Sequence, residues 1–394
     1  MSELSQQRVP PTLLPVSHDR PQMAALLHVS FLTVFRSSSS GLPSMTSNEA
    51  TAEYAPVVPT HDDLRLLSEA NDEKLTSRRR ANAVFVVLAR NSDLFQWLES
   101  MRQMEDRFNH WARYDYVFLN DEEFTDEFKR RTQSLTKGKC QYGLIEHDHW
   151  NQPDWIDEEK ATTARVKMVE AGIIYAGSVP YRNMCRFNSG FFFKHPLLAQ
   201  YDYYWRIEPD VRFFCDLSYD PFLLMQDTGK VYGFTISLYE FIETIPTLWD
   251  ETMKFIKEHP EYVAPDNAME FVSDNGGESY NLCHFWSNFE IADLRFWRSQ
   301  AYTDYFNHLE STGGFYYERW GDAPVHSLAA TLFANKSQLH FFDDIGYRHS
   351  PFQHCPQGPS HEKNRCICNP SDNFDFEGYS CTRRYVNMPP PKEL

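Results

Sequence analysis

The chain has 394 residues, of which 42% are hydrophobic and 15% aromatic, and its formal net charge is -17. This length suffices for one large α/β domain or two smaller ones, and the apolar residues can fill a substantial core. The negative charge argues against nucleic acid as a partner, because binding to a phosphate backbone needs a basic face.

The first 80 residues differ in composition from the rest and are predicted to form a tail or stem. They carry Pro, Ser and charged clusters such as "RSSSSGLPS" and "SRRR", which do not build a packed core. The apolar stretch 23–35 is shorter than the ~20 residues that a helix needs to cross a bilayer. It has the length of a signal-peptide core, but it starts late and lacks a basic region immediately before it. We therefore predict a marginal signal anchor at 23–35; the alternative is a short apolar patch in a disordered tail.

Folded sequence is predicted from residue 81 onward. The apolar, β-branched run 83–90 is typical of a buried strand, and N-cap side chains at 91–93 precede apolar residues at helical spacing. Nucleotides usually bind at the carboxyl end of the first strand in an open α/β sheet. Arg90 lies at that end and is a candidate to contact a base, a ribose or a phosphate. The alternative is an ordinary surface salt bridge.

Strand and helix patterns alternate along the next part of the chain. This alternation predicts an α/β fold with a mixed, mostly parallel central sheet over residues 81–394. The predicted strands are 114–121, 142–150 (a strand or its exit loop), 203–207 and 230–241, and the predicted helices are 122–133, 158–172 and 245–260.

Two carboxylates, Glu208 and Asp210, flank a proline inside the aromatic run 203–214. Because proline cannot continue a central strand, the strand should end here and place both acids at its carboxyl edge. Burying an unpaired carboxylate is costly, so such a pair normally has a cation, a cationic partner or a proton-transfer role. Mg²⁺ and Mn²⁺ prefer oxygen ligands and bridge to substrate phosphates. The pair alone is a weak signal, because acid-x-acid occurs by chance in most chains of this size.

The stretch 281–297 mixes polar residues with Phe and Trp and contains the most suggestive single carboxylate. On a helix, Glu290 would share a face with Trp286. A carboxylate surrounded by aromatic side chains is a candidate for nucleophilic or acid–base work. The alternative is a helix-surface acid paired with Arg295 or Arg298.

Two stretches nearer the carboxyl terminus carry further candidates. Asp322 stands where a helix is predicted to begin, so it could cap that helix or contact a sugar hydroxyl. The stretch 341–355 is typical of a strand exit and contains His349 and His354. One of these histidines could complete a metal shell begun by Glu208.

The chain has eight cysteines, and half of them fall in the last forty residues. No CxxC spacing occurs, which disfavours a zinc site of the usual kind. An even number of cysteines can form disulfides in a secretory compartment, and the alternative is a set of buried free thiols.

Six ordered motifs together resemble the fungal Golgi α-1,2-mannosyltransferases of glycosyltransferase family 15. They are "FVVLARNSDL", "YRNMCRFNSGFFF", "YYWRIEPDVRFFCDLSYDPF", "YNLCHFWSNFEIADLRFWRS", "YERWGDAPVHSLA" and "DDIGYRHSPFQHCP". The resemblance covers roughly residues 81–385 and is far more specific than any single site above.

This resemblance implies a single GT-A-like domain that uses GDP-mannose as donor and Mn²⁺ as metal. It also implies that mannose is added in α-1,2 linkage to a terminal α-mannoside of a glycoprotein glycan. It further implies a lumenal Golgi enzyme of cell wall mannan synthesis with a membrane anchor, although the apolar stretch 23–35 is a poor match for one. Glu208 and His349 match the positions that bind the metal, with Asp210 nearby. Arg90 and Tyr181 match positions associated with the nucleotide-sugar. Glu290 matches the proposed nucleophile, and Asp322 matches a position on the acceptor side.

Retention of configuration at the anomeric carbon leaves two routes open. One forms a covalent glycosyl-enzyme on a carboxylate below the sugar, and the other is attack from the leaving group's own face. Glu290 could serve in either route.

A non-catalytic mannoside-binding protein on the same fold is the main rival to the mannosyltransferase. A metal-dependent phosphohydrolase would need more acids or histidines around two metals.

Overall fold

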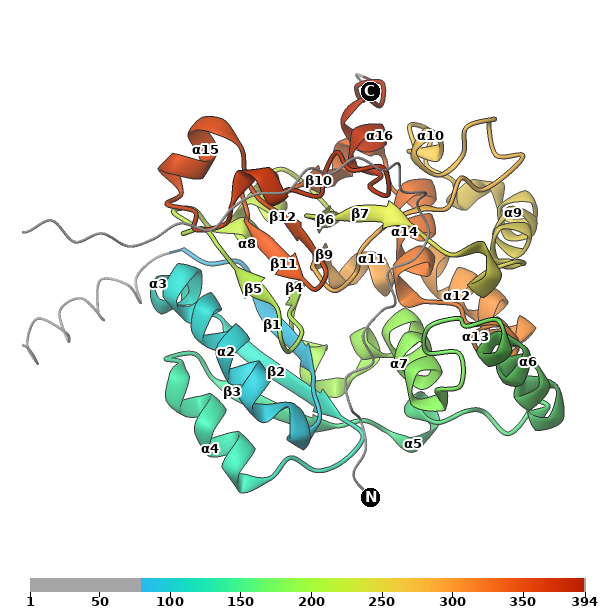
Figure 1. The fold of residues 1–394 in the computed structure, drawn as a ribbon, viewed down its shortest axis with the longest axis horizontal. Helices are drawn as coiled ribbons and strands as arrows, with labels where there is room; N and C mark the ends of the chain where they lie inside the picture. The colour runs from blue at the N-terminus through green and yellow to red at the C-terminus, as the bar shows by residue number, and fades with distance from the viewer. Residues whose placement is uncertain (1–78, 393–394) are drawn as a thin grey trace, which may run out of the picture. The chain divides into compact units, whose positions relative to one another are not determined.

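A computed structural model describes residues 79–392, in which a seven-stranded sheet has the strand order β10-β6-β9-β4-β1-β2-β3 (Figure 1). Strand β9 runs antiparallel to β4 and β6, and all other neighbours in the sheet are parallel. The predicted mixed, mostly parallel sheet is therefore confirmed. Its strands are β1 (Ala83–Leu88), β2 (Asp115–Asn120), β3 (Cys140–Leu144), β4 (Tyr203–Arg206), β6 (Tyr232–Phe234), β9 (Glu290–Asp293) and β10 (Leu339–Phe341).

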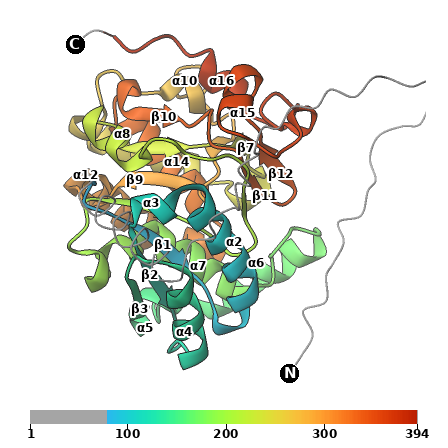
Figure 2. The same cartoon turned by 90° about the vertical axis from the view of Figure 1, so that its left-hand side faces the viewer.

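Side-chain alternation along the strands divides the core into two layers, one on each face of the sheet. Phe85 and Trp205 belong to one layer, whereas Val84 and Tyr204 belong to the other. Among residues 79–392, three helices cover the first layer: α2 (Leu94–Met104), α4 (Asp126–Leu135) and α8 (Pro221–Asp227). Four helices of the same range cover the second layer: α7 (Val179–Gly190), α9 (Leu248–Glu258), α12 (Gln300–Thr312) and α14 (Asp322–Phe333) (Figures 1 and 2). Both faces are buried, which explains why the parallel strands are almost continuously apolar.

Two small sheets extend the fold beyond the central one. Strands β5 (Arg212–Phe213), β11 (Tyr347–His349) and β12 (Phe352–His354) form one, and β7 (Ser237–Tyr239) and β8 (Cys283–Phe285) form the other. The remaining helices are α3 (His110–Ala112), α5 (His147–Trp150), α6 (Glu158–Glu170), α10 (Met269–Val272), α11 (Leu294–Trp297), α13 (Gly314–Tyr317), α15 (Gly358–Lys363) and α16 (Thr382–Val386).

Two sequence predictions of secondary structure are wrong in detail. The predicted strand 230–241 is divided into β6 and β7, which join different sheets. The residues around Glu290 form strand β9 rather than a helix, because β4 and β6 bind this segment from both sides. Tertiary pairing thus overrides the local helical spacing.

Between residues 79 and 392, no helix is long and apolar enough to span a membrane. The predicted anchor at 23–35 and most of the predicted tail lie outside the described residues. The first described strand begins at Ala83, close to the boundary predicted at residue 81.

The chain has three disulfides, of which two fasten the carboxyl-terminal segment to the rest of the fold and one lies within that segment. They join Cys215 to Cys366, Cys283 to Cys381 and Cys355 to Cys368, whereas Cys140 and Cys185 are buried free thiols. Six of the cysteines therefore form disulfides, as one interpretation of the sequence predicted, and two are the buried free thiols of the alternative.

Removal of the Cys283–Cys381 bond by double replacement with serine is expected to lower the melting temperature by several degrees. The bond closes a loop with a sequence separation of 98, and such a loop restricts the unfolded chain by about 4–5 kcal/mol. Differential scanning calorimetry measures the effect, with Cys140→Ser as the control for loss of a buried thiol. An unchanged melting temperature, or peptide mapping without reduction that finds all eight thiols free, would contradict this arrangement.

Candidate functional site

One edge of the central sheet collects the charged residues of the site. Strands β1 and β4 are parallel, so Arg90 and Glu208 follow strands that end at the same edge. Strand β9 runs the opposite way and begins at this edge, where Glu290 stands in register with Arg206. Three segments distant in sequence therefore place polar side chains within one region.

Glu208 lies between an arginine and a histidine. Its Oε1 accepts a hydrogen bond from Arg206 at 2.5 Å, and its Oε2 lies 3.5 Å from Nε2 of His349. Burial alone would raise the pKa of Glu208, but the charge of Arg206 and the contact with His349 lower it to about 2. Burial likewise opposes protonation of His349, yet Glu208 raises its pKa above the usual value. The carboxylate is thus ionised and faces an imidazole.

The pairing of β11 with β5 brings His349 to Glu208. Tyr347 and Arg348 align with Phe213 and Arg212, so the next residue of β11 reaches the turn after β4. This long-range contact joins positions separated by more than a hundred residues.

Asp210 occupies the same turn but forms no ion pair or hydrogen bond with this pair among residues 79–392. Its backbone is left-handed, with φ of 63°, and its side chain is exposed. Asp210, Glu208 and His349 do not form a cluster of three donor atoms within 4.8 Å. The structure therefore brings together two of the three predicted metal ligands.

Glu290 is a buried carboxylate with hydrogen bonds at both oxygens. Oε1 accepts from the Tyr204 hydroxyl at 2.7 Å, and Oε2 accepts from the Tyr232 hydroxyl at 3.1 Å. Nδ1 of His326 lies 3.0 Å from Oε2, while its Nε2 lies 3.0 Å from the carbonyl of Asn188. The side chain of Glu290 is only 1% exposed. The alternative interpretation, a helix-surface acid paired with arginine, is therefore wrong.

Helix α14 contributes two side chains one turn apart. Asp322 Oδ2 accepts from Arg206 at 2.5 Å and from the Ser287 hydroxyl at 2.8 Å, and His326 contacts Glu290. Gly321 is the N-cap of this helix, so the first of the two possibilities for Asp322, that it caps the helix, is wrong. Arg206 consequently links the carboxylates of Glu208 and Asp322, which compensates the charge of both in a buried setting.

Tyr181 stands at the start of α7 in the neighbourhood of Asp322. The guanidinium of Arg319 lies 5.2 Å from the centre of its ring. Burial raises the pKa of Tyr181 well above its usual value, and nearby Asp322 and Glu240 raise it further. Arg319 itself lies 3.8 Å from Glu240.

Arg90 is exposed at the carboxyl end of β1, as predicted. Its backbone N–H donates to Asp93 at 2.9 Å. The alternative of a surface salt bridge finds no support among residues 79–392, where Arg90 forms no ion pair.

Sequence reasoning did not single out four side chains that hold the site: Arg206, Tyr204, Tyr232 and His326. Strand alternation could have identified Arg206, the last residue of β4. It lies two residues before Glu208, and side chains two residues apart on an extended chain point to the same side. Helical spacing could have identified His326, which follows Asp322 by four residues. Tyr232 had no local signal, because only the order of the strands brings it to Glu290.

Two other clusters lie apart from these residues. His354, the alternative metal-binding histidine, is buried and pairs with Asp375 at 2.8 Å. Cys355, His361 and Cys368 place three donor atoms within 4.8 Å, but the two cysteines are joined in a disulfide and offer no thiolate.

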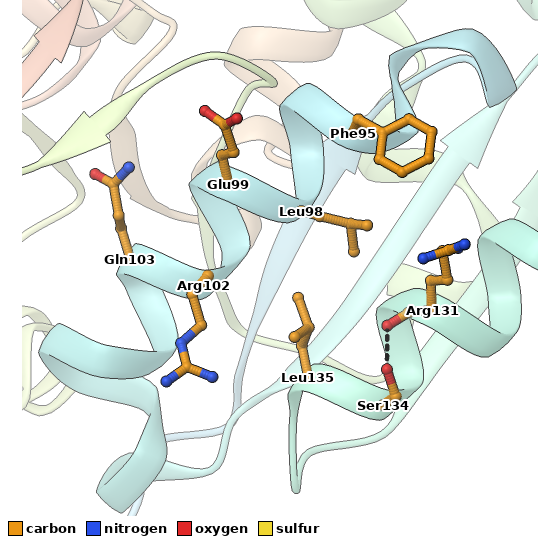
Figure 3. Close-up of a pocket in the computed structure, with 8 residues that line it drawn as sticks. All are labelled: Phe95, Leu98, Glu99, Arg102, Gln103, Arg131, Ser134 and Leu135. Carbon is orange, nitrogen blue, oxygen red and sulfur yellow. Dashed lines mark hydrogen bonds between the residues drawn. The ribbon is translucent and has the colours of Figure 1, made fainter.

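A groove of about 600 Å³ separates α2 from α4 on the surface. Figure 3 shows Leu98 and Leu135 facing one another across it, with Phe95 at one end. Its lining residues include none of the candidate site residues.

Comparisons with known proteins agree on one family. Residues 45–389 match a family model described as glycolipid 2-alpha-mannosyltransferase. Glycolipid 2-alpha-mannosyltransferase 2 of Candida albicans is 56% identical over 318 residues, which are 80% of this chain and 69% of that protein. Alpha-1,2 mannosyltransferase KTR1 of Saccharomyces cerevisiae is 55% identical over 310 residues, which are 78% of this chain and 79% of that protein.

Two solved structures are also similar to the chain. Core-mannan synthase A of Aspergillus fumigatus in its Mn/GDP form has a TM-score of 0.74 and 42% identity, with 79% of this chain and 85% of that chain covered. The mannosyltransferase Ktr4p of S. cerevisiae in complex with GDP has a TM-score of 0.74 and 41% identity, with 82% and 91% covered.

Proposed function

The chain belongs to the glycolipid 2-alpha-mannosyltransferase family, and from this premise we propose that it transfers mannose from GDP-mannose to a terminal α-mannoside. It is a retaining α-1,2-mannosyltransferase with the GT-A-like fold predicted from the sequence. Its donor is GDP-mannose and its metal is Mn²⁺, in keeping with the Mn/GDP form of the Aspergillus relative. The observation that carries the proposal is the meeting of Glu208, Arg206, His349 and Glu290 at one sheet edge.

We propose that Glu208 and His349 hold the metal. A partly exposed carboxylate and an imidazole, 3.5 Å apart, provide one oxygen and one nitrogen donor, which suits Mn²⁺ with substrate phosphates as further ligands. When bound, the metal neutralises negative charge that develops on the departing diphosphate. Arg206 orients Glu208 through its hydrogen bond, and we assign Asp210 a supporting position near the ligands rather than a direct bond.

We assign Arg90 and Tyr181 to the nucleotide-sugar and Asp322 to the acceptor. Arg90 is exposed at the edge where β1 ends, so its guanidinium is available to a base, ribose or phosphate. Tyr181 and Asp322 neighbour one another on α7 and α14. The Asp322 carboxylate can accept a hydrogen bond from an acceptor hydroxyl, because only one of its oxygens is taken by Arg206 and Ser287.

We further propose that Glu290 stabilises positive charge on the mannosyl ring and forms no covalent bond. Both of its oxygens already accept hydrogen bonds, and its burial strengthens the field that it exerts on the sugar. In this route the bond from the anomeric carbon to the diphosphate oxygen breaks while the acceptor oxygen bonds to the same face. The proton of the acceptor hydroxyl passes to the departing phosphate oxygen.

The proposed setting is the Golgi lumen, where the enzyme would extend mannose chains of glycoproteins and of the cell wall mannan. Family membership supports this setting, and its membrane anchor would fall at 23–35, outside the described residues. Co-localisation of the full chain with a Golgi marker tests it. A diffuse cytosolic signal would contradict it.

Transfer of radiolabelled mannose from GDP-mannose to methyl α-mannoside tests the proposed reaction. We expect transfer with Mn²⁺ and none with EDTA, and the product should carry an α-1,2 linkage by NMR. Well-folded protein that binds methyl α-mannoside without transferring mannose would instead favour the rival, a non-catalytic mannoside-binding protein.

A further inference from the structure

A second groove lies between strand β12 and the segment 371–379, and no role proposed above uses it. Its volume is about 500 Å³. The lining combines ring faces with amide, hydroxyl and carboxylate groups, and it contains no lysine or arginine. The lining residues that matter here are Phe352, Gln353, Asp372, Asn373, Glu377 and Tyr379.

Rings connect this groove to the metal-binding region. The Trp286 ring lies 4.8 Å from the ring of His349 and 5.7 Å from that of Phe352, which lines the groove. The Tyr379 ring, which also lines the groove, lies 6.0 Å from the ring of Phe352. The groove therefore begins two rings away from a proposed metal ligand.

The groove also adjoins the acceptor side of the site. Tyr379 lies 6.1 Å from the ring of Phe241, the residue that follows Glu240. Burial raises the pKa of Tyr379 to about 12, and the neighbouring Glu240 carboxylate adds to the rise. Glu240 in turn lies 3.8 Å from Arg319, whose guanidinium stands 5.2 Å from the centre of the Tyr181 ring. Phe241 and Glu240 therefore lie between the groove and the residues assigned to the donor and the acceptor.

We propose that this groove is an accessory subsite for neutral mannose residues of the acceptor glycan, behind its terminal mannose. This subsite presupposes that the chain is a mannosyltransferase, and it would allow the enzyme to favour long acceptor glycans over short ones. Aromatic faces pack against the C–H face of a sugar ring, and carboxylate and amide oxygens accept hydrogen bonds from its hydroxyls. A lining with two carboxylates and no cation does not suit a phosphate group.

A ring stack and a buried hydrogen-bonded pair hold the walls of the groove in place. Phe352 stacks on buried Phe374 at 4.0 Å, and the buried pair of His354 and Asp375 ties β12 to the segment that forms the opposite wall. A preformed wall lowers the cost of ordering the site when a ligand binds. Within residues 79–392 the Tyr379 hydroxyl has no hydrogen-bond partner, so it is free to meet a sugar hydroxyl.

The test compares two acceptors, methyl α-mannoside and an α-1,2-linked mannotriose, on the full chain. We expect Tyr379→Ala to lower the ratio of kcat/KM for mannotriose over methyl α-mannoside about tenfold, with a smaller fall for the exposed Asp372→Ala. Phe95→Ala, which removes an exposed ring from the distant groove between α2 and α4, is the matched control and should leave the ratio unchanged.

Saturation-transfer NMR with mannotriose provides a readout that does not depend on transfer. We expect saturation of the reducing-end rings in the wild type and its loss in Tyr379→Ala. An unchanged ratio in both groove variants, an equal loss with both acceptors, or weaker binding of GDP would each overturn the subsite. If the wild type transfers to neither acceptor, the proposed function fails, and the NMR signal still decides whether the groove binds mannosides.

Discussion

Replacement of Glu290 by glutamine is expected to lower turnover about 10²–10³-fold, and affinity for GDP in the presence of Mn²⁺ should change little. The substitution preserves shape but removes a negative charge that is buried beside the strand end where mannose would react. It also leaves Tyr204 and Tyr232 with one carboxamide oxygen where the carboxylate offered two. Initial rates of transfer and titration calorimetry with GDP measure the two effects separately.

Glu105→Gln is the matched control for this substitution. Glu105 is also buried and accepts a hydrogen bond from a tyrosine hydroxyl, that of Tyr116 at 2.8 Å, but it packs on the opposite face of the sheet. We expect a lower melting temperature and normal turnover per folded molecule. Equal losses of turnover in both variants would mean that Glu290 acts only through stability.

A different substitution at this position, Glu290→Ala, separates the two routes to retention. If Glu290 stabilises charge without bonding to the sugar, azide should not rescue Glu290→Ala, and intact-mass spectra of the wild type with a slow donor analogue should show no mannosyl adduct. An adduct mapped to Glu290, or rescue with formation of a β-mannosyl azide, would establish the covalent route instead.

The chain's strands and helices were predictable where local pattern and burial agree. The run before Arg90 is apolar on both faces, as a central parallel strand must be, and it forms β1. Glu290 shows the limit of this reasoning. Its neighbours suit a helix, but the order of the strands places it between β4 and β6, and strand order depends on the whole chain.

The site was predictable as a set of residue types but not as a set of contacts. The resemblance identified Glu208 and His349, whereas their distance follows from the pairing of β11 with β5. No local pattern indicated that Arg206 would join Glu208 to Asp322. Such a bridge requires knowing that β4 ends opposite the start of α14.

Replacement of Glu208 by glutamine is expected to weaken Mn²⁺-supported binding of GDP at least about 100-fold. The variant keeps an oxygen at the site but loses the charge that holds a divalent cation, and it leaves Arg206 with only one of its two carboxylate partners. His349→Ala should cause a loss of similar size. Because the two side chains act on one ion, the double variant should lose little more than either single one.

Asp210→Asn is the control that decides between the two acids of the motif, because it removes the same charge two residues from Glu208. Asparagine tolerates the left-handed backbone at this position, so the fold should not be disturbed. We expect GDP affinity within about threefold of the wild type, because the exposed Asp210 carboxylate is not clustered with Glu208 and His349. Calorimetric titration with and without EDTA measures all the variants, and their affinities should converge once the metal is removed. A loss in Asp210→Asn equal to that in Glu208→Gln would make Asp210 a direct ligand, whereas normal Mn²⁺-supported affinity in Glu208→Gln would remove Glu208 from the metal site.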